Sequence, residues 1–198
     1  MSRIAVISHY ADSLVNFRGE LIKSMVNRGH KVKAYAPEKD YKEKLNNLGA
    51  DYEQIFLQRT NMNPLADLRS LFHLYFKLKK YSPDVIFSYA IKPVIYGGIT
   101  SWINKIENIY SLIPGVGSVF IDYNSNSLMF KIINYLYKIG LKKNKTVFFQ
   151  NPDDQALFKK LGIINSNHKT VIVNGSGVDT NYYYYTKQIK NPISYYCI

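Results

Sequence analysis

Cysteine is nearly absent from this sequence, which contains a single one, Cys197. One thiol cannot form an internal disulfide or a cysteine-based metal site, and such a composition fits a reducing compartment. The N-terminus also lacks a basic region followed by an apolar core, the pattern of a secretory signal peptide. We therefore expect a cytoplasmic protein without structural disulfides.

Long apolar runs and glycine-rich phosphate loops are missing as well. The longest apolar stretch, residues 85–103, is interrupted by Lys92, Pro93 and two glycines, so it is better interpreted as strand, turn and helix than as a membrane span. The segment after the first predicted strand, SHYADSLVNFRG, has one glycine, which matches neither the Gly-x-Gly-x-x-Gly fingerprint nor a Walker loop. These absences argue against nicotinamide, flavin and P-loop enzymes.

Acidic residues are scarce: 14 Asp and Glu stand against 26 Lys and Arg, a formal net charge of +12. One interpretation is attraction to an anionic partner such as nucleic acid, acidic lipid or a diphosphate. The other is a compositional bias without function, because the lysines are scattered rather than grouped. No RNA-binding motif, zinc-finger spacing or arginine-rich arm is present, so nucleic acid is disfavoured.

What is present is a globular chain of 198 residues, 46% of them hydrophobic, enough for one well-filled domain. Short apolar runs typical of buried strands alternate with helical periodicities. The strands are predicted at residues 4–7, 31–36, 52–57, 85–88, 109–112, 146–149 and 170–173. Residues 8–16 are expected to form a polar loop, and the helix that ends before Pro83 is marked by Leu65, Leu68, Phe72, Tyr75 and Leu78.

This alternation of strands and helices favours one parallel sheet with helices on both faces. Right-handed crossovers then produce a Rossmann-like, doubly wound α/β sheet of about seven strands. Ligands of such sheets bind beyond the carboxyl ends of the strands. Candidate site residues should therefore lie in the loops that follow the strands.

The loops after the first and fourth strands carry basic residues. The first contains His9, Asn16 and Arg18, and the arginine stands at a helix opening, where it suits an anion; the alternative is a solvated surface arginine. Lys92 precedes a proline-opened helix and has the same two interpretations, an anion ligand or a lysine whose stem lies along the strand end. If the two strands are neighbours, Arg18 and Lys92 flank one crevice that suits a diphosphate.

The later loops are rich in glycine. Gly115 and Gly117, in IPGVGSVF, permit close backbone approach to a ligand or simply form a turn. Gly175 and Gly177, in NGSGVDT, either expose amides to an anion or form a hinge between units. Asn151 follows the sixth strand in the capped sequence Asn-Pro-Asp-Asp. The histidines show no metal-ligand spacing, so no metal site is expected.

Several segments together resemble the N-terminal half of family 4 glycosyltransferases: NFRGELIKSMVNRGHKVKAYAPE, PDVIFSYAIKPVIYGG, IPGVGSVF, VFFQNPDDQALF and VNGSGVDTNYY. Within that family the chain is most similar to bacterial enzymes that extend sugars on a polyprenyl-diphosphate carrier. The resemblance covers roughly residues 3–182. It implies a two-domain GT-B architecture, retention of anomeric configuration, and no essential metal or other cofactor. The N-terminal domain would receive a lipid-linked or glycan acceptor, and the C-terminal domain would hold the sugar nucleotide.

The resemblance also implies domain limits. Residues 1–180 resemble the N-terminal domain, and residues 181–198 resemble the linker and first strand of a C-terminal domain. We therefore expect a truncated acceptor-binding half, inactive alone, in which Gly175 and Gly177 form the domain crossing, while Gly115, Gly117 and the first loop face the donor phosphates. No catalytic residue is assigned. The alternatives are a subunit of a split two-chain glycosyltransferase and an unrelated Rossmann-like enzyme that binds a nucleotide sugar.

Residues 127–143, SLMFKIINYLYKIGLKK, are predicted to be helical and apolar around most of the circumference. Lys131, Asn134, Lys138 and Lys142 form a narrow polar stripe. One interpretation is a mostly buried helix. The other is a peripheral contact with the inner face of the cell membrane, in which the lysines meet anionic headgroups.

Overall fold

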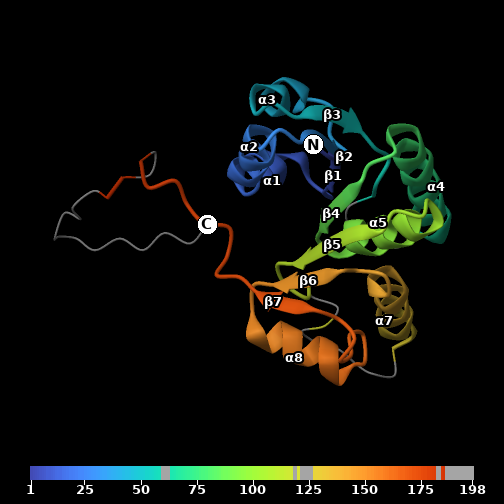
Figure 1. The fold of residues 1–198 in the computed structure, drawn as a ribbon. Helices are drawn as coiled ribbons and strands as arrows, with labels where there is room; N and C mark the ends of the chain where they lie inside the picture. Colours follow the sequence, from blue (N-terminus) through green and yellow to red (C-terminus); the bar gives the residue numbers. More distant parts are fainter. Residues whose placement is uncertain (59–62, 118–119, 121–126, 182–183, 186–198) are drawn as a thin grey trace, which may run out of the picture.

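The computed structural model describes residues 1–58, 63–117, 120, 127–181 and 184–185. Seven parallel strands form one sheet in the order β3-β2-β1-β4-β5-β6-β7, wound outwards in both directions from the β1/β4 pair (Figure 1). The predicted Rossmann-like, doubly wound α/β fold is therefore confirmed. The strand expected within residues 191–198 lies outside the described residues.

The strands are short, with apolar side chains at their centres. Their bounds are β1 Arg3–Ile7, β2 Lys31–Ala36, β3 Asp51–Gln54, β4 Val85–Tyr89, β5 Asn108–Ile113, β6 Thr146–Phe149 and β7 Thr170–Ile172. β3 is shorter than the predicted strand at residues 52–57. The amide of Ile55 still donates to the carbonyl of Ala36 on β2 at 3.0 Å, but the amide of Phe56 donates to His73 Nδ1 of α4 at 2.9 Å, and regular pairing with β2 has ended.

The described helices are α1 Ala11–Asn16, α2 Gly19–Asn27, α3 Lys42–Asn47, α4 Pro64–Tyr81, α5 Ile91–Ile103, α7 Leu128–Leu141 and α8 Pro152–Lys160. α1 corrects the expectation of a polar loop at residues 8–16. The amide of Ala11 donates to Glu38 Oε2 at 2.8 Å across 27 residues, and Leu14 is fully buried. A cap this distant leaves no local sequence signal. Within the described residues, no helix combines the length and apolar character that crossing a bilayer requires.

Two helices begin as the sequence predicts, with asparagine before proline. Asn63 Oδ1 accepts from the amide of Leu65 at 3.1 Å, and Asn151 Oδ1 accepts from the amide of Asp153 at 2.9 Å. Each side chain thereby satisfies an amide that the first helical turn leaves without an intrahelical partner.

The sheet divides the core into two layers because side chains alternate across each strand. Ala5 and Ile7 of β1 face a layer covered by α4, α5, α7 and α8. Ile4 and Val6 face the opposite layer, to which α1, α2 and α3 contribute. Helices therefore cover both faces, as predicted, and α4, α5 and α7 stand together on one side of the sheet (Figure 1).

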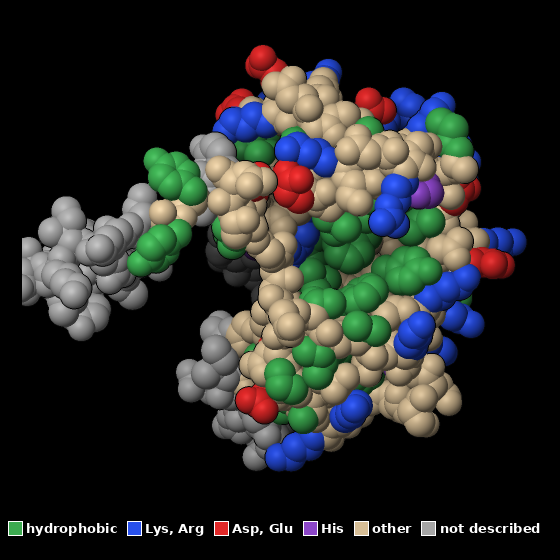
Figure 2. All heavy atoms as spheres, turned by 60° about the vertical axis from the view of Figure 1, so that its left-hand side comes forward, with side chains coloured by type: hydrophobic (Ala, Val, Ile, Leu, Met, Phe, Trp, Pro, Cys, Tyr) green, Lys and Arg blue, Asp and Glu red, His purple; other side chains and the backbone are tan. Residues whose placement is uncertain are grey.

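The layer under α1, α2 and α3 is only half covered. These helices contact β2 and β3. The same side of β4 to β7 carries Phe87, Tyr110, Phe148 and Val171, which are only partly buried. Figure 2 shows hydrophobic side chains gathered in the middle of one face of the molecule. This half of the sheet is therefore less shielded from solvent on one side than on the other.

α5 and α7 are in backbone contact. A Cβ atom at Gly98 would lie 1.8 Å from the carbonyl oxygen of Gly140, and a Cβ at Gly140 would lie 2.8 Å from the Cα of Ile95. No larger residue fits either position without moving a helix. The two helices are thus fixed against each other.

Candidate functional site

The switch point of the sheet lies between β1 and β4, which pair from Ile4↔Val85 to Ile7↔Ser88. The first and fourth strands are therefore neighbours, which is the condition for the predicted crevice between Arg18 and Lys92. In open α/β sheets, ligands bind beyond the carboxyl ends of the strands at this point. The residues that follow Ile7 and Ser88 are accordingly the first candidates for a binding site.

Arg18 is the clearest candidate in this region. It stands at the N-cap of α2 and is 5% exposed, which excludes a solvated surface arginine. Its guanidinium carbon lies 4.9 Å from the ring centroid of Tyr89. Nη1 donates to the carbonyl of Phe17 at 2.9 Å and to the hydroxyl of Ser176. Burial lowers the pKa of Arg18, an effect that Tyr89 opposes, but an arginine remains charged in proteins.

The charge of Arg18 is not matched by a carboxylate. Among the described residues its guanidinium forms no ion pair, and its Nε has no hydrogen-bond partner. A buried cation with an unused donor is unfavourable unless something compensates it. An anionic ligand would supply both the charge and the missing acceptor.

A chain of buried hydroxyls supports the ring beneath Arg18. Tyr89 Oη lies 2.8 Å from Ser13 Oγ, which lies 3.1 Å from Ser8 Oγ. Burial raises the pKa of Tyr89, against the lowering effect of the hydrogen bonds from Ser13 and Ser8. Tyr89 is therefore a neutral phenol near neutral pH. Sequence reasoning missed this residue, although its place at the end of the fourth strand was a usable signal.

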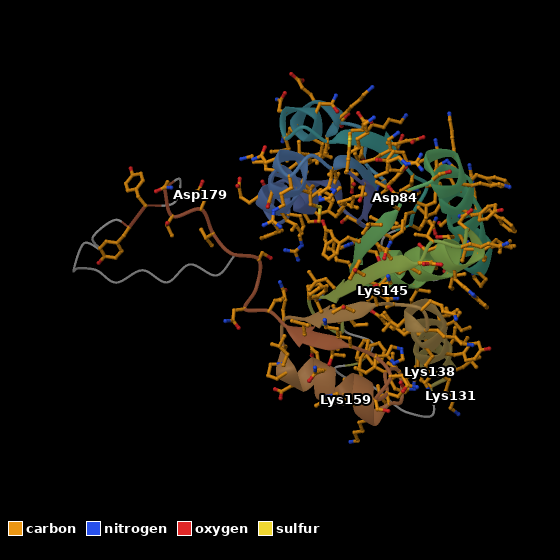
Figure 3. The ribbon with its side chains drawn as sticks, viewed as in Figure 1. Asp84, Lys131, Lys138, Lys145, Lys159 and Asp179 are labelled. Carbon is orange, nitrogen blue, oxygen red and sulfur yellow. The ribbon has the colours of Figure 1, made fainter. Side chains whose placement is uncertain are left out.

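Ser176 brings the segment after β7 to the same place. Gly175 and Gly177 on either side of it have φ values of 88° and 76°, and a Cβ at either would meet nothing within 4 Å. Backbone conformation, rather than crowding, therefore favours glycine there. Since β7 lies three strands from β4, the segment turns back along the carboxyl edge of the sheet to reach Arg18. Asp179 lies further on, where the chain extends away from the sheet (Figure 3).

Lys92 is engaged on the other side of the sheet. Its Nζ lies 2.8 Å from Asp67 Oδ1 of α4, and both side chains are largely buried. Tyr96 also hydrogen-bonds to Asp67. Arg18 instead packs on Tyr89, which belongs to the layer under α1, α2 and α3. A site shared by Arg18 and Lys92 stays a prediction, and an anion at Lys92 would have to compete with Asp67.

The junction between β4 and α5 is strained. Ala90 has φ 70° and ψ 162°, a region that is essentially restricted to glycine and costs about 1–3 kcal/mol for other residues. Ala90 caps α5 without a side-chain hydrogen bond, and Lys92 lies in the first turn. Strained backbone of this kind concentrates at functional sites, which favours this junction as part of the site.

The loop after β5 packs against that first turn. Gly117 has φ 76°, and a Cβ there would lie 2.8 Å from the Cδ1 of Ile91. Gly115 is exposed, and a Cβ at that position would meet nothing within 4 Å. The structure therefore brings Gly117 close to the β4–α5 junction, while Gly115 faces solvent.

The remaining predicted residues have local roles or open surroundings. His9 is half-buried directly after β1. The exposed Asn16 donates from Nδ2 to Asp12 Oδ2 at 2.7 Å, and Asn151 caps α8. Ligand contacts of these three residues stay predictions. Within the described residues, no group of three or more His, Cys, Asp or Glu is arranged to hold a metal ion.

Solved structures of other proteins have the same fold. A glycosyltransferase from Rickettsia africae shares it with a TM-score of 0.60, over 92% of this chain and 45% of its own, at 18% identity. HepE from Anabaena, solved in complex with UDP-glucose, gives a TM-score of 0.62 over 92% of this chain and 46% of its own, at 16% identity. At these identities the likeness establishes the fold alone, and this chain corresponds to about half of each neighbour.

The sequence then identifies the family. The model of the glycosyl transferase 4-like family matches residues 4–151, so the chain belongs to that family. It is also 30% identical over 179 residues to N,N'-diacetylbacillosaminyl-diphospho-undecaprenol alpha-1,3-N-acetylgalactosaminyltransferase from Campylobacter jejuni. The match covers 89% of this chain and 47% of that enzyme. The chain thus spans about half the length of its curated relative.

Proposed function

We propose that the chain is the acceptor-binding half of a retaining glycosyltransferase, which moves a sugar from a sugar nucleotide to a polyprenyl-diphosphate-linked or polysaccharide acceptor. The observation that carries the proposal is the 30% identity to the Campylobacter transferase over 89% of this chain. The name of that enzyme specifies a diphospho-undecaprenol acceptor. The buried, unmatched cation at the switch point is consistent with an acceptor that carries a diphosphate.

The proposal divides the work between two domains. Residues 1–180 form the acceptor-side domain, and residues 181–198 lead into a donor-side domain. The sugar nucleotide binds well only when the donor-side domain is present. Support comes from the resemblance of the sequence to one half of such enzymes and from the 47% coverage of the curated relative.

Arg18 has a defined role in this scheme. Its Nε and its charge meet the acceptor diphosphate, because charge-assisted hydrogen bonds to phosphate oxygens are strong in a site shielded from water. Ser176, between Gly175 and Gly177, accepts a hydrogen bond from the same guanidinium, so the diphosphate binds beside the segment that leads out of the domain. Lys92 joins the site if the diphosphate displaces Asp67.

The proposal also places the protein at the inner face of the cell membrane, in contact through residues 127–143, because a polyprenyl-linked acceptor stays in the bilayer. α7 buries Phe130, Ile133 and Tyr137 against the domain, whereas Leu128 and Tyr135 are exposed. Lys131 and Lys138 lie along this helix (Figure 3). One face of α7 is thus core, and the other remains free for a peripheral contact.

Calorimetric titration tests the proposal. A short-chain prenyl diphosphate should bind more tightly than the matching prenyl alcohol, and the difference should persist at high salt because buried charges are screened much less than exposed ones. The double variant Arg18→Met, Lys92→Met should lose this preference. Equal affinity for the diphosphate and the alcohol contradicts the acceptor site. A dissociation constant near or below about 10 μM for a sugar nucleotide contradicts the division of labour between domains.

A further inference from the structure

α4 is apolar on the face that points away from the sheet. Leu65, Leu68, Phe72 and Phe76 are 80%, 51%, 53% and 61% exposed. They follow one another at intervals of three, four and four residues, so they form one stripe along the helix. The core face is a different one, where Leu74 is buried. A surface helix normally presents polar residues to solvent. An exposed apolar stripe therefore indicates a surface that a binding partner covers.

Cations flank the stripe. Arg69, Lys79 and Lys80 are exposed on α4, and Arg69 is held over the ring of Phe56 at 4.3 Å from its centroid. The helix has one acidic residue, Asp67, which is paired with Lys92 of α5. The outer face of α4 therefore combines four large apolar side chains with positive charge and no carboxylate.

These properties select one occupant. A second copy of the chain would bring like charges together across a two-fold contact, which is unfavourable. A bilayer interface with anionic headgroups accommodates both features, because the apolar side chains enter the acyl boundary while the cations meet the headgroups. We propose that the outer face of α4 binds anionic membranes through Leu65, Leu68, Phe72, Phe76, Arg69, Lys79 and Lys80.

The position of the stripe suits such a role. Leu65 lies in the same first turn of α4 as Asp67, whose partner Lys92 follows the switch-point strand β4. α4, α5 and α7 form one layer (Figure 1), so α4 adds a second surface to the one proposed for α7. The inference rests on the exposed face of α4 and not on the proposed transfer reaction.

Vesicle flotation with the full chain tests the inference. The vesicles are phosphatidylcholine alone or mixed with phosphatidylglycerol. The variant Leu68→Gln, Phe72→Gln, Phe76→Gln should bind the anionic vesicles about tenfold or more weakly. The variant Arg69→Gln, Lys79→Gln, Lys80→Gln should lose about fivefold per cation at low salt. All substituted side chains are exposed, and circular dichroism checks that each variant is folded.

The matched control alters the corresponding exposed face of α7, with Leu128→Gln, Ile132→Gln and Tyr135→Gln. The inference predicts that both α4 variants lose binding whether or not this control does. It is overturned if the wild-type chain does not float with anionic vesicles at low salt, or if both α4 variants float like the wild type. It is also overturned if sedimentation shows a wild-type dimer that the apolar α4 variant dissociates while vesicle binding is unchanged. The prenyl diphosphate titration uses no vesicles, so the proposed function succeeds or fails separately.

Discussion

Replacing Arg18 with methionine tests whether this arginine serves ligand binding or the stability of the fold. The side chain is 5% exposed, so its charge is largely removed from water. Methionine keeps an apolar chain of about the length of the arginine stem and carries no charge. If the arginine is retained for an anion, its removal should harm binding while leaving stability nearly unchanged.

The expected magnitude follows from opposing contributions. The substitution removes a buried unsatisfied donor, which favours the variant by about 1–3 kcal/mol. It also removes the stacking on Tyr89, a loss of about 0.5–2 kcal/mol, and the hydrogen bonds to Phe17 and Ser176, a loss of about 1 kcal/mol each. At their midpoints these terms leave a small net loss, so we expect the free energy of unfolding to fall by about 1 kcal/mol.

Urea unfolding measures the stability of the variant, and prenyl diphosphate titration measures its affinity for the ligand. Arg18→Met should weaken diphosphate binding by about tenfold or more, the value of one charge-assisted hydrogen bond. Arg28→Met, at an exposed position, is the matched control and should change neither quantity. A loss of more than about 2 kcal/mol in the free energy of unfolding, with affinity intact, would refute the reasoning and make Arg18 a structural residue.

Three further predictions concern stability. Gly98→Ala should lower the free energy of unfolding by about 2 kcal/mol or more, because its methyl meets backbone at 1.8 Å, whereas Gly115→Ala should be nearly neutral in the same urea titration. Asn151→Ala should cost about 1 kcal/mol by removing a helix cap, and unchanged thermal unfolding would contradict that role. Burial, followed by the charge of Lys77, lowers the pKa of His73, so its contribution to stability is present above the ordinary value of about 6.5 and is lost as pH falls below it. His73→Asn, which keeps an acceptor, should therefore flatten the decline in stability measured below that pH; an equally steep decline would show that other groups cause it.

The strands could be predicted because most of them are short apolar runs, and the parallel, doubly wound arrangement follows from their alternation with helices. The strand predicted at residues 146–149 coincides with β6 Thr146–Phe149. The faces of the helices were harder to predict. Leu65, Leu68 and Phe72 mark α4 in the sequence, yet they are exposed while Leu74 is buried. Periodicity groups residues on one side of a helix, but it does not say which side meets the sheet when both are apolar.

The site, too, could be predicted only in part from the sequence. The carboxyl-edge loops were identified because the fold class fixes where they lie. The partners within them were not, because contacts such as Arg18 to Ser176 join residues 158 positions apart. The pairing of Lys92 with Asp67 likewise depends on how α4 packs beside α5. Side-chain partners of this kind are properties of tertiary packing and leave no pattern in a single sequence.

The contact of Gly98 with Gly140 has a mechanical consequence. Helices separated by side chains can slide, because the side chains between them change rotamer; helices that touch through their backbones cannot. α5 and α7 should therefore move as one rigid body. A ligand that shifts the first turn of α5 should then also displace the outer face of α7. Native-state hydrogen exchange can check this, since the amides of both helices should open with one common free energy. Separate opening energies for the two helices would mean that no motion passes from the carboxyl edge of the sheet to that surface.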